Sequence, residues 1–191
     1  MKPHLKSIHY EVFGIGSAHG VDQVGWRVID QLQQEAVELN GIHRLQVPLD
    51  LLTHASASAS ASRRPWIIVD ACLGECVGKI HCWRWPELPA SASLAGQVSS
   101  HGIGLLDVLR MGQELSVLPD AIWIYGIEVG AGSKVACSAQ TDSWDPSHEL
   151  HLAIIRSAEQ IAVRLSVEID QFANRHPPAQ LRTLNTRTQP G

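Results

Sequence analysis

Residues 66–71 read Trp-Ile-Ile-Val-Asp-Ala, and this stretch decides the fold of the chain. A short, continuous apolar run is typical of a parallel strand that is buried on both faces of a sheet. Pro65 stands directly before the run, and the stretch 55–62 upstream only alternates Ala and Ser. We therefore predict that the run forms a central strand and that Asp70 lies at its end. The Ala/Ser stretch is expected to be a loop or a weak helix extension.

Strand-like and helix-like patterns alternate on both sides of this run. Apolar residues at every second position indicate strands, and apolar residues at every third or fourth position indicate helices. The segment 79–85 is expected to be an antiparallel neighbour, and 86–99 is expected to be a loop. The expected strands are 8–15, 43–47, 66–70, 79–85 and 122–127, and the expected helices are 22–40, 102–115 and a last helix starting at Asp145-Pro146.

The pattern predicts an α/β fold with a single domain, in which helices sandwich a twisted, mostly parallel sheet of the phosphorylase/hydrolase-like kind. The domain is expected to cover residues 1–173, and 174–191 is expected to be a disordered polar tail. The inward-facing helix positions are predicted to be Val24, Val28, Leu32, Ala36, Leu105, Val108, Leu109, Leu115, Ile154, Ala158, Ile161, Leu165 and Phe172.

Composition excludes some classes of partner. The chain has 191 residues, of which 45% are hydrophobic, and this suits one compact domain. Lys and Arg total 15 against 19 Asp and Glu, so the net charge of −4 argues against nucleic acid as a partner. We find no apolar stretch of membrane-spanning length and no signal peptide, so we expect a cytoplasmic protein with no membrane partner. The four cysteines need not pair in that compartment.

Three polar segments are predicted to meet at one edge of the sheet. Ligands of open α/β sheets bind at the carboxyl ends of the strands. The loop 16–22, Asp70 and the segment 99–101 fall there by this interpretation. A carboxylate directly after an apolar run is costly if it is buried without a partner. Asp22, Asp70 and His101 together would suit a divalent metal ion with open coordination positions.

Each of these residues also has an ordinary structural explanation. Asp22 could cap the helix that follows it, and Asp70 could cap a helix or turn. His101 could be a surface or capping residue near the start of its helix. Sequence spacing alone does not bring the three side chains together.

Other motifs point to other chemistry, and each is weak. Gly14-x-Gly16-x-x-x-Gly20 resembles a dinucleotide-binding turn but lacks the usual third-glycine spacing. The chain has no Gly-x-Ser-x-Gly elbow and no His-Glu-x-x-His helix, which argues against a serine hydrolase and a conventional zinc peptidase. A zinc site is suggested by Cys72, Cys76 and Cys82 together with His81, but their spacing matches no common zinc motif. We therefore expect the cysteines to be core or surface thiols.

Four segments, in this order, resemble the hydrogenase maturation protease family. GIGSAHGVDQVGWRVIDQL (14–32) is similar to the family's opening turn and helix, and WIIVDA (66–71) to its apolar strand ending in Asp-Ala. SSHGIGLLDVLRMGQELSVLPDAIWIYGIE (99–128) resembles its Ser/Thr-x-His-x-x-Gly-Leu helix with the strand ending in Gly-Ile-Glu. DPSHEL (145–150) is similar to the start of its last helix. The chain departs from the pattern at Val21-Asp22, where the family usually has two acidic residues.

The resemblance implies a function. The chain would be an endopeptidase, grouped with aspartyl proteases, that removes the C-terminal extension of a nickel–iron hydrogenase large-subunit precursor already loaded with nickel. The family's metal-binding and catalytic positions fall on Asp22, Asp70 and His101. Nickel would arrive with the substrate, and a monomer is expected. The alternative is a non-catalytic, chaperone-like protein that binds nickel or the precursor on the same fold.

Overall fold

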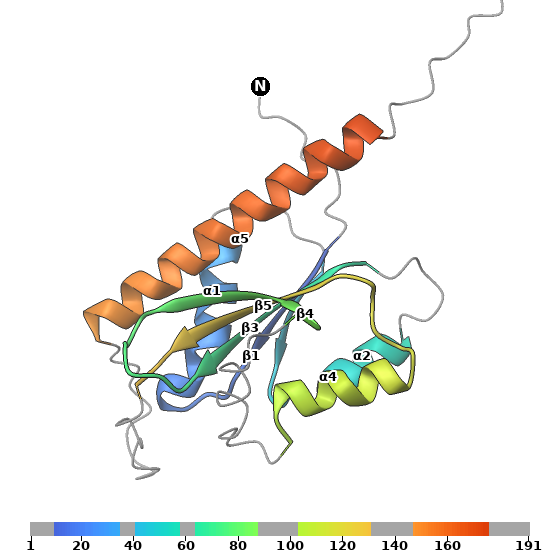
Figure 1. The fold of residues 1–191 in the computed structure, drawn as a ribbon. Coiled ribbons are helices and arrows are strands. Elements are labelled where there is room, and N and C mark those ends of the chain that lie inside the picture. The colour runs from blue at the N-terminus through green and yellow to red at the C-terminus, as the bar shows by residue number, and fades with distance from the viewer. Residues whose placement is uncertain (1–9, 35–40, 58–63, 88–102, 131–146, 176–191) are drawn as a thin grey trace, which may run out of the picture.

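The apolar run at residues 66–71 forms the middle strand of a five-stranded sheet with the order β2-β1-β3-β5-β4 (Figure 1). The computed structural model describes residues 10–34, 41–57, 64–87, 103–130 and 147–175. Strands β2, β1, β3 and β5 are parallel, whereas β4 is antiparallel to β5, as predicted for this segment. The strands are β1 (Glu11–Ile15), β2 (Ile42–Leu45), β3 (Trp66–Cys72), β4 (Ile80–Trp85) and β5 (Ile122–Glu128).

Helices cover both faces of the sheet, as predicted (Figure 1). The short 3-10 turn η1 leads directly into α1, and α1 packs with α5 on one face. The helices α2 and α4 pack on the other face. These elements are η1 (Gly20–Gln23), α1 (Val24–Gln34), α2 (Asp50–Ala57), α4 (Leu105–Glu114) and α5 (His148–Arg175).

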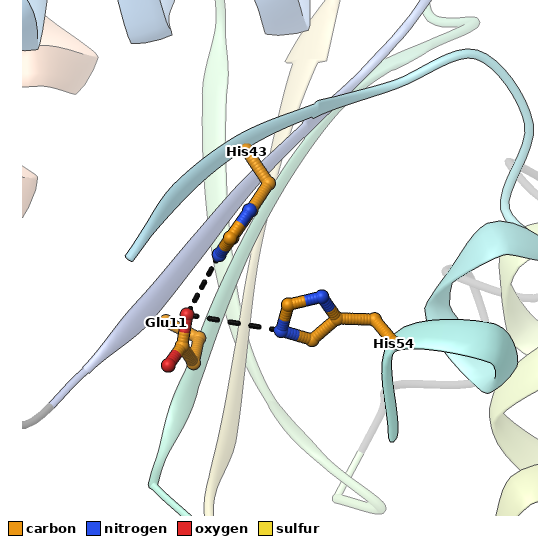
Figure 2. A group of neighbouring side chains, drawn as sticks. All are labelled: Glu11, His43 and His54. Atoms are coloured by element: carbon orange, nitrogen blue, oxygen red, sulfur yellow. Dashed lines mark hydrogen bonds and ion pairs between the residues drawn. The ribbon is translucent and has the colours of Figure 1, made fainter. Parts of the chain in front are cut away.

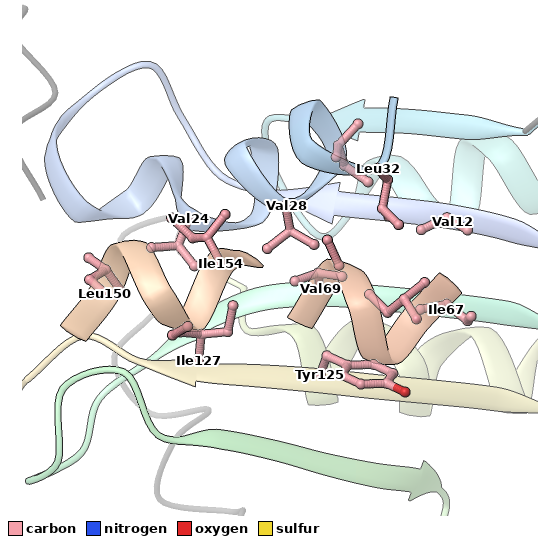
Figure 3. Packing of buried hydrophobic residues seen from close by; sticks show 14 of the residues in the cluster. Val12, Val24, Val28, Leu32, Ile67, Val69, Tyr125, Ile127, Leu150 and Ile154 are labelled. Carbon is pink, nitrogen blue, oxygen red and sulfur yellow. The ribbon is translucent and has the colours of Figure 1, made fainter. Parts of the chain in front are cut away.

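The two faces of β3 contribute side chains to two separate hydrophobic clusters, because side chains alternate along a strand. Ile67 and Val69 belong to the cluster beneath α1 and α5, where residues of the two helices meet over the sheet (Figure 3). Trp66 and Ile68 belong to the cluster beneath α2 and α4. Burial on both faces explains why this strand has no polar residue before Asp70.

Most of the predicted helix positions within the described residues are buried. Leu115 is the exception, since 63% of its surface is exposed. The helix α4 ends at Glu114, and Ser116 takes a positive φ of 54°, so Leu115 already belongs to a chain that is turning away. The confirmed inward positions are Val24, Val28, Leu32, Leu105, Val108, Leu109, Ile154, Ala158 and Ile161. Ala36 lies outside the described residues, and the side chains of Leu165 and Phe172 are not described.

Helix α2 is missing from the sequence prediction, which left no helix before the Ala/Ser stretch. Leu51 is fully buried and Ala55 is 6% exposed, so one turn of spacing supplies an apolar face that packs in the second cluster. The Asp50 carboxylate accepts a hydrogen bond from the Val47 amide at 3.4 Å, beside the start of the helix. One leucine and one alanine at helical spacing therefore dock this short helix.

The ends of the predicted elements also differ from the structure. The first helix was expected from 22, but Asp22 lies in η1 and the α-helix starts at Val24. The last helix starts at His148, where the Leu150 amide donates to Ser147 Oγ at 3.3 Å, and the expected start at 145–146 lies outside the described residues. Residues 174 and 175, where the polar tail was expected to begin, still belong to α5, and the rest of the expected tail lies outside the described residues. None of the helices in the described ranges has the length and apolar character needed to cross a membrane.

Candidate functional site

The glycines of the first segment allow α1 to start directly against the sheet. A Cβ atom at Gly25 would lie 2.2 Å from Ile15 O and 2.8 Å from Val69 O, so no larger residue fits between the helix and these strands. A Cβ at Gly16 would lie 2.1 Å from Asp22 O. These close approaches hold η1, which contacts β3, at the carboxyl edge of the sheet. They explain the glycines by packing, without a bound dinucleotide.

Asp22 lies in η1 and is partly buried. The Ser17 amide donates to the main-chain oxygen of Asp22 at 3.4 Å, so the loop from β1 closes on this residue. Its neighbour Gln23 is buried and accepts a 2.7 Å hydrogen bond from Arg27 Nη2. The amide oxygen of Gln23 is thus occupied by Arg27. Asp22 is the acidic residue of η1 at this edge of the sheet.

Asp70 lies in β3, two residues before the strand ends at Cys72 rather than at its end as predicted. Burial, and to a smaller extent the negative charge of Asp22, raise the pKa of Asp70 to about 8, while a hydrogen bond from the Ala71 amide opposes the shift. The register partner of Asp70 on β5 is Gly126, which adds no side chain beside the carboxyl group. The structure therefore brings two of the three predicted site residues into electrostatic contact.

A third carboxylate, Glu128, is part of the same edge, and the sequence analysis did not weigh it as a site residue. It is buried at the end of β5, where Oε2 accepts from the Cys76 amide at 2.8 Å and Oε1 lies 2.6 Å from His81 Nε2. Lys79 Nζ is 3.8 Å from Oε1. A Cβ at Gly74 would lie 2.1 Å from Glu128 Oε2, so this glycine makes room for the carboxylate.

The residues that contact Glu128 reverse the effect of burial on its pKa. Burial by itself raises the pKa of Glu128, but the hydrogen bonds from His81 and the Cys76 amide, with the charges of His81 and Lys79, hold it below its ordinary value. Glu128 is therefore an anion that is already paired. The signal that could have found it was its place at the end of an apolar strand, the same signal that identified Asp70.

The cysteines do not form a zinc site among the residues that the structure describes. Cys72 is buried, whereas Cys76 and Cys82 are exposed. Burial, with the negative charges of Glu128 and Asp70, raises the pKa of Cys72 to about 12, and the Lys79 charge only partly offsets this. Metals and electrophiles react with the thiolate, so Cys72 is an unreactive core thiol, as the sequence analysis expected.

His101 lies outside the described residues. The helix α4, which begins shortly after it, packs on the face of the sheet that includes Trp66 and Ile68. Asp70 belongs to this same face, because side chains alternate along β3.

The described part of this edge can hold or move a proton and can bind a cation. A carboxyl group with a raised pKa beside a second carboxylate can keep a proton near neutral pH. A divalent cation would instead relieve the repulsion between the two groups, and oxygen ligands from Asp22 and Asp70 are suitable for it. Both kinds of chemistry are compatible with hydrolysis.

Solved structures with this architecture carry consistent names. The hydrogenase maturating endopeptidase HybD from E. coli superposes with a TM-score of 0.59 at 20% identity, covering 83% of this chain and 93% of that one. The chain has the fold of the hydrogenase maturation proteases. The [NiFe] hydrogenase maturation protease HycI from Thermococcus kodakarensis KOD1 shares this fold with a TM-score of 0.56 at 22% identity, over 83% and 93% of the two chains.

A third structure with the maturation protease fold is the [NiFe] hydrogenase maturation protease HybD from Thermococcus kodakarensis. It superposes with a TM-score of 0.52 at 19% identity, over 82% of this chain and 97% of that chain. No family model and no curated protein gave a match to the sequence. The likeness is thus one of fold, and the activity must be argued from the site.

Proposed function

We propose that this protein is a hydrogenase maturation endopeptidase, which removes the C-terminal extension of a nickel–iron hydrogenase large-subunit precursor that already carries nickel. The observation that carries the proposal is the pairing of Asp22 with Asp70 at the carboxyl edge of a sheet of the maturation protease fold. The two carboxylates come from separate segments of the sequence. Three glycines pack closely to hold the first segment against the second, namely Gly14, Gly16 and Gly25.

The donor set fits the nickel of the substrate. Two carboxylates whose charges repel each other are stabilised when a divalent cation lies between them. Asp22 and Asp70 would hold this cation, with His101 as the third ligand that the sequence resemblance assigns. Bound metal would polarise the scissile carbonyl group or activate a water molecule.

The chain's own residues supply a proton site as well. The raised pKa of Asp70, about 8, keeps a proton on this carboxyl group at neutral pH when no cation is bound. Beside Asp22, this arrangement is similar to the carboxyl pair of aspartic proteases, in which one group keeps its proton because like charges are close. Asp70 would then donate a proton or a hydrogen bond to the scissile carbonyl oxygen.

The alternative, a non-catalytic protein that binds nickel or the precursor on the same fold, uses the same two carboxylates. It differs from the peptidase only in the fate of the precursor. We further propose that the protein works as a cytoplasmic monomer.

Mass spectrometry of a purified, nickel-loaded precursor tests the proposal. We expect the wild-type protein to release a C-terminal peptide, and we expect Asp22→Ala and His101→Ala to release none over the same period. Asp107→Asn is the matched control, because this carboxylate is exposed on α4 and paired with Arg110 at 2.8 Å. It should cleave at the wild-type rate. Circular dichroism of each variant shows whether it is folded.

The outcomes separate the two functions. Cleavage by the wild type and by both site variants would leave the activity standing and show that the site is wrong. If the wild type binds precursors from several hydrogenase classes and cleaves none, the endopeptidase proposal fails and the binding protein replaces it.

A further inference from the structure

A second group of metal-type side chains lies at the opposite end of the sheet. Glu11 begins β1, His43 lies in β2 and His54 lies in α2, and the three side chains point toward one another (Figure 2). Glu11 pairs in register with Trp66, four residues before Asp70 along β3. At about 3.3 Å per residue, the two positions are about 13 Å apart along the strand. This group, which we call the Glu-His-His cluster, is thus separate from the candidate active site.

The distances in the Glu-His-His cluster fit a metal ion. Glu11 Oε2 lies 2.7 Å from His43 Nε2 and 3.8 Å from His54 Nε2. The candidate ligand atoms of all three residues lie within 4.8 Å of one another. Ligand atoms about 2.1 Å from a tetrahedral zinc ion are about 3.4 Å apart. The two Glu11 distances fall on either side of this value, so small side-chain rotations would complete the geometry.

Surrounding residues hold these ligands in place. Arg64 Nη1 contacts Glu11 Oε1 at 3.0 Å, which leaves Oε2 facing the histidines. The Phe13 ring stacks on His43 with a centroid distance of 5.1 Å and meets His54 edge-on at 4.9 Å. Contacts of this kind fix the orientation of the candidate ligands.

Gly41 makes room for the carboxylate of the cluster. It has a φ of +107°, and a Cβ there would lie 2.7 Å from Glu11 Oε2. A larger residue would be strained at this φ and would also collide with the ligand atom.

One atom of the cluster has no hydrogen-bond partner among the described residues. His54 Nε2 is buried, and its ion-pair contact with Glu11 Oε2 is 3.8 Å long, which is too long for a hydrogen bond. A buried polar atom left unpaired is costly and needs an explanation. Burial lowers the pKa of His54, as does the nearby His43, while Glu11 opposes the shift.

An ion-pair network that only fastens β2 and α2 to β1 is the simpler explanation. It accounts for the contacts of Glu11 with Arg64 and His43. It gives His54 only an ion-pair contact of 3.8 Å with Glu11 and leaves the buried Nε2 atom without a hydrogen bond from the described residues (Figure 2). A cation between the three residues would satisfy this atom and bind three separate elements together.

We propose that Glu11, His43 and His54 bind a transition-metal dication of the zinc and nickel class, through Glu11 Oε2 and the two Nε2 atoms. Two imidazoles and one carboxylate suit such borderline metals, whereas Mg²⁺ and Ca²⁺ take mainly oxygen ligands. The side chains of His43 and His54 are 32% and 25% exposed, so an ion can enter from solvent and keep a water ligand. The bound ion stabilises the attachment of β2 and α2 to β1.

Calorimetric titration of the chelator-treated, full-length protein with Zn²⁺ and with Ni²⁺ tests the site. We use Asp22→Ala/Asp70→Asn as the background, so that the candidate active site contributes no binding. We expect one ion per chain with a Kd below about 0.1 mM. Glu11→Gln and His54→Phe should each weaken binding at least about tenfold. Mg²⁺ should not bind.

The control is His81→Phe, which removes a histidine that contacts a different carboxylate, Glu128. It should leave the affinity unchanged. Zn²⁺ should also raise the midpoint of thermal unfolding in the background protein and in the His81 variant, but not in Glu11→Gln. Glu11→Gln retains the size of the side chain, so it still tests the site if His54→Phe fails to fold.

Two results would overturn the proposal. One is a background protein that binds neither ion below about 1 mM. The other is an affinity that stays at the background value in both Glu11→Gln and His54→Phe while the variants remain folded. Neither result bears on the proposed endopeptidase, because the precursor assay tests that function separately.

Discussion

Asp70 and Glu128 are carboxylates of the neighbouring strands β3 and β5, yet the fold shifts their pKa values in opposite directions. Asp70 is raised to a pKa of about 8 by burial and by the charge of Asp22. Glu128 is also buried, but its contacts with His81 and the Cys76 amide hold its pKa below the ordinary value. The negative charges of both groups raise the pKa of Cys72, which is the register partner of Glu128.

The difference shows which group is available for chemistry. Burial raises the pKa of any carboxyl group, and the outcome then depends on whether donors or another anion face it. Glu128 has its charge already paired, so it contributes to stability. Asp70 faces a like charge, and under the proposed function a substrate or cation would relieve this repulsion.

Processing of the precursor should show the largest contrast. We expect Asp70→Asn to lower kcat/KM for cleavage by at least about a hundredfold, because amides can neither carry the proton nor bind the cation as an anion. Glu128→Gln should lower it by less than about tenfold, since this side chain only supports the edge. Timed mass spectrometry of the precursor measures both. Equal losses would erase the functional distinction between the two carboxylates.

The pH dependence of stability should have opposite signs for the two groups. The folded-state pKa of Asp70 lies above its unfolded value of 3.8, so its stabilising contribution is complete below pH 3.8 and is lost as the pH rises toward about 8. Relative to Asp70→Asn, the free energy of unfolding of the wild type should fall by about 1.4 kcal/mol per pH unit between pH 5 and 7. Urea unfolding at these two pH values gives the slope. A flat difference would mean that Asp70 is ionised throughout.

Loss of the Glu128 charge should destabilise the fold at neutral pH. We expect Glu128→Gln to reduce the free energy of unfolding by about 2 kcal/mol at pH 7, because hydrogen bonds to an ionised group are lost. The pKa of Glu128 is lowered on folding, so this contribution is present above pH 4.5 and disappears as the pH falls further. The gap between the variant and the wild type should therefore narrow in acid. A gap that widens there would contradict the assigned pairing.

Removal of the second charge should shift Asp70 only partly. We expect Asp22→Asn to lower the pKa of Asp70 while leaving it above its ordinary value, because burial is the larger cause. The gain in stability at pH 8 should be on the order of 1 kcal/mol or less. Titration of the Asp70 carboxyl group by NMR measures the shift directly. No shift at all would show that the two aspartates do not interact.

The sequence predicted those parts of the molecule whose residues lie in continuous patterns. The run before Asp70 identified the central strand because burial on both faces leaves no polar position. Helix α2 was missed, because its large apolar residues, Leu51 and Leu52, are adjacent and the Ala and Ser residues that follow give little pattern. Asp22 and Asp70 were proposed from their places after strands, and the structure brings them together.

Other parts of the two sites depend on contacts that are remote in sequence. Glu128 is 47 residues from His81 and 52 from Cys76, so nothing along the chain marks it as a paired anion. Glu11 and His43 are 32 residues apart and meet only because β1 and β2 are neighbours. No periodicity or local motif connects these residues.

The sequence by itself determined the layered α/β architecture, because apolar spacing sets which faces are buried. It also proposed Asp22 and Asp70 as site residues, because polar groups gather where strands end. The tertiary structure alone decided that Asp70 keeps its proton and that Glu128 is paired. It also decided that Glu11 lies beside two histidines. The reason is physical: pKa values and metal geometry depend on distances through space and on exclusion of water. Both arise only when remote segments of the chain pack together.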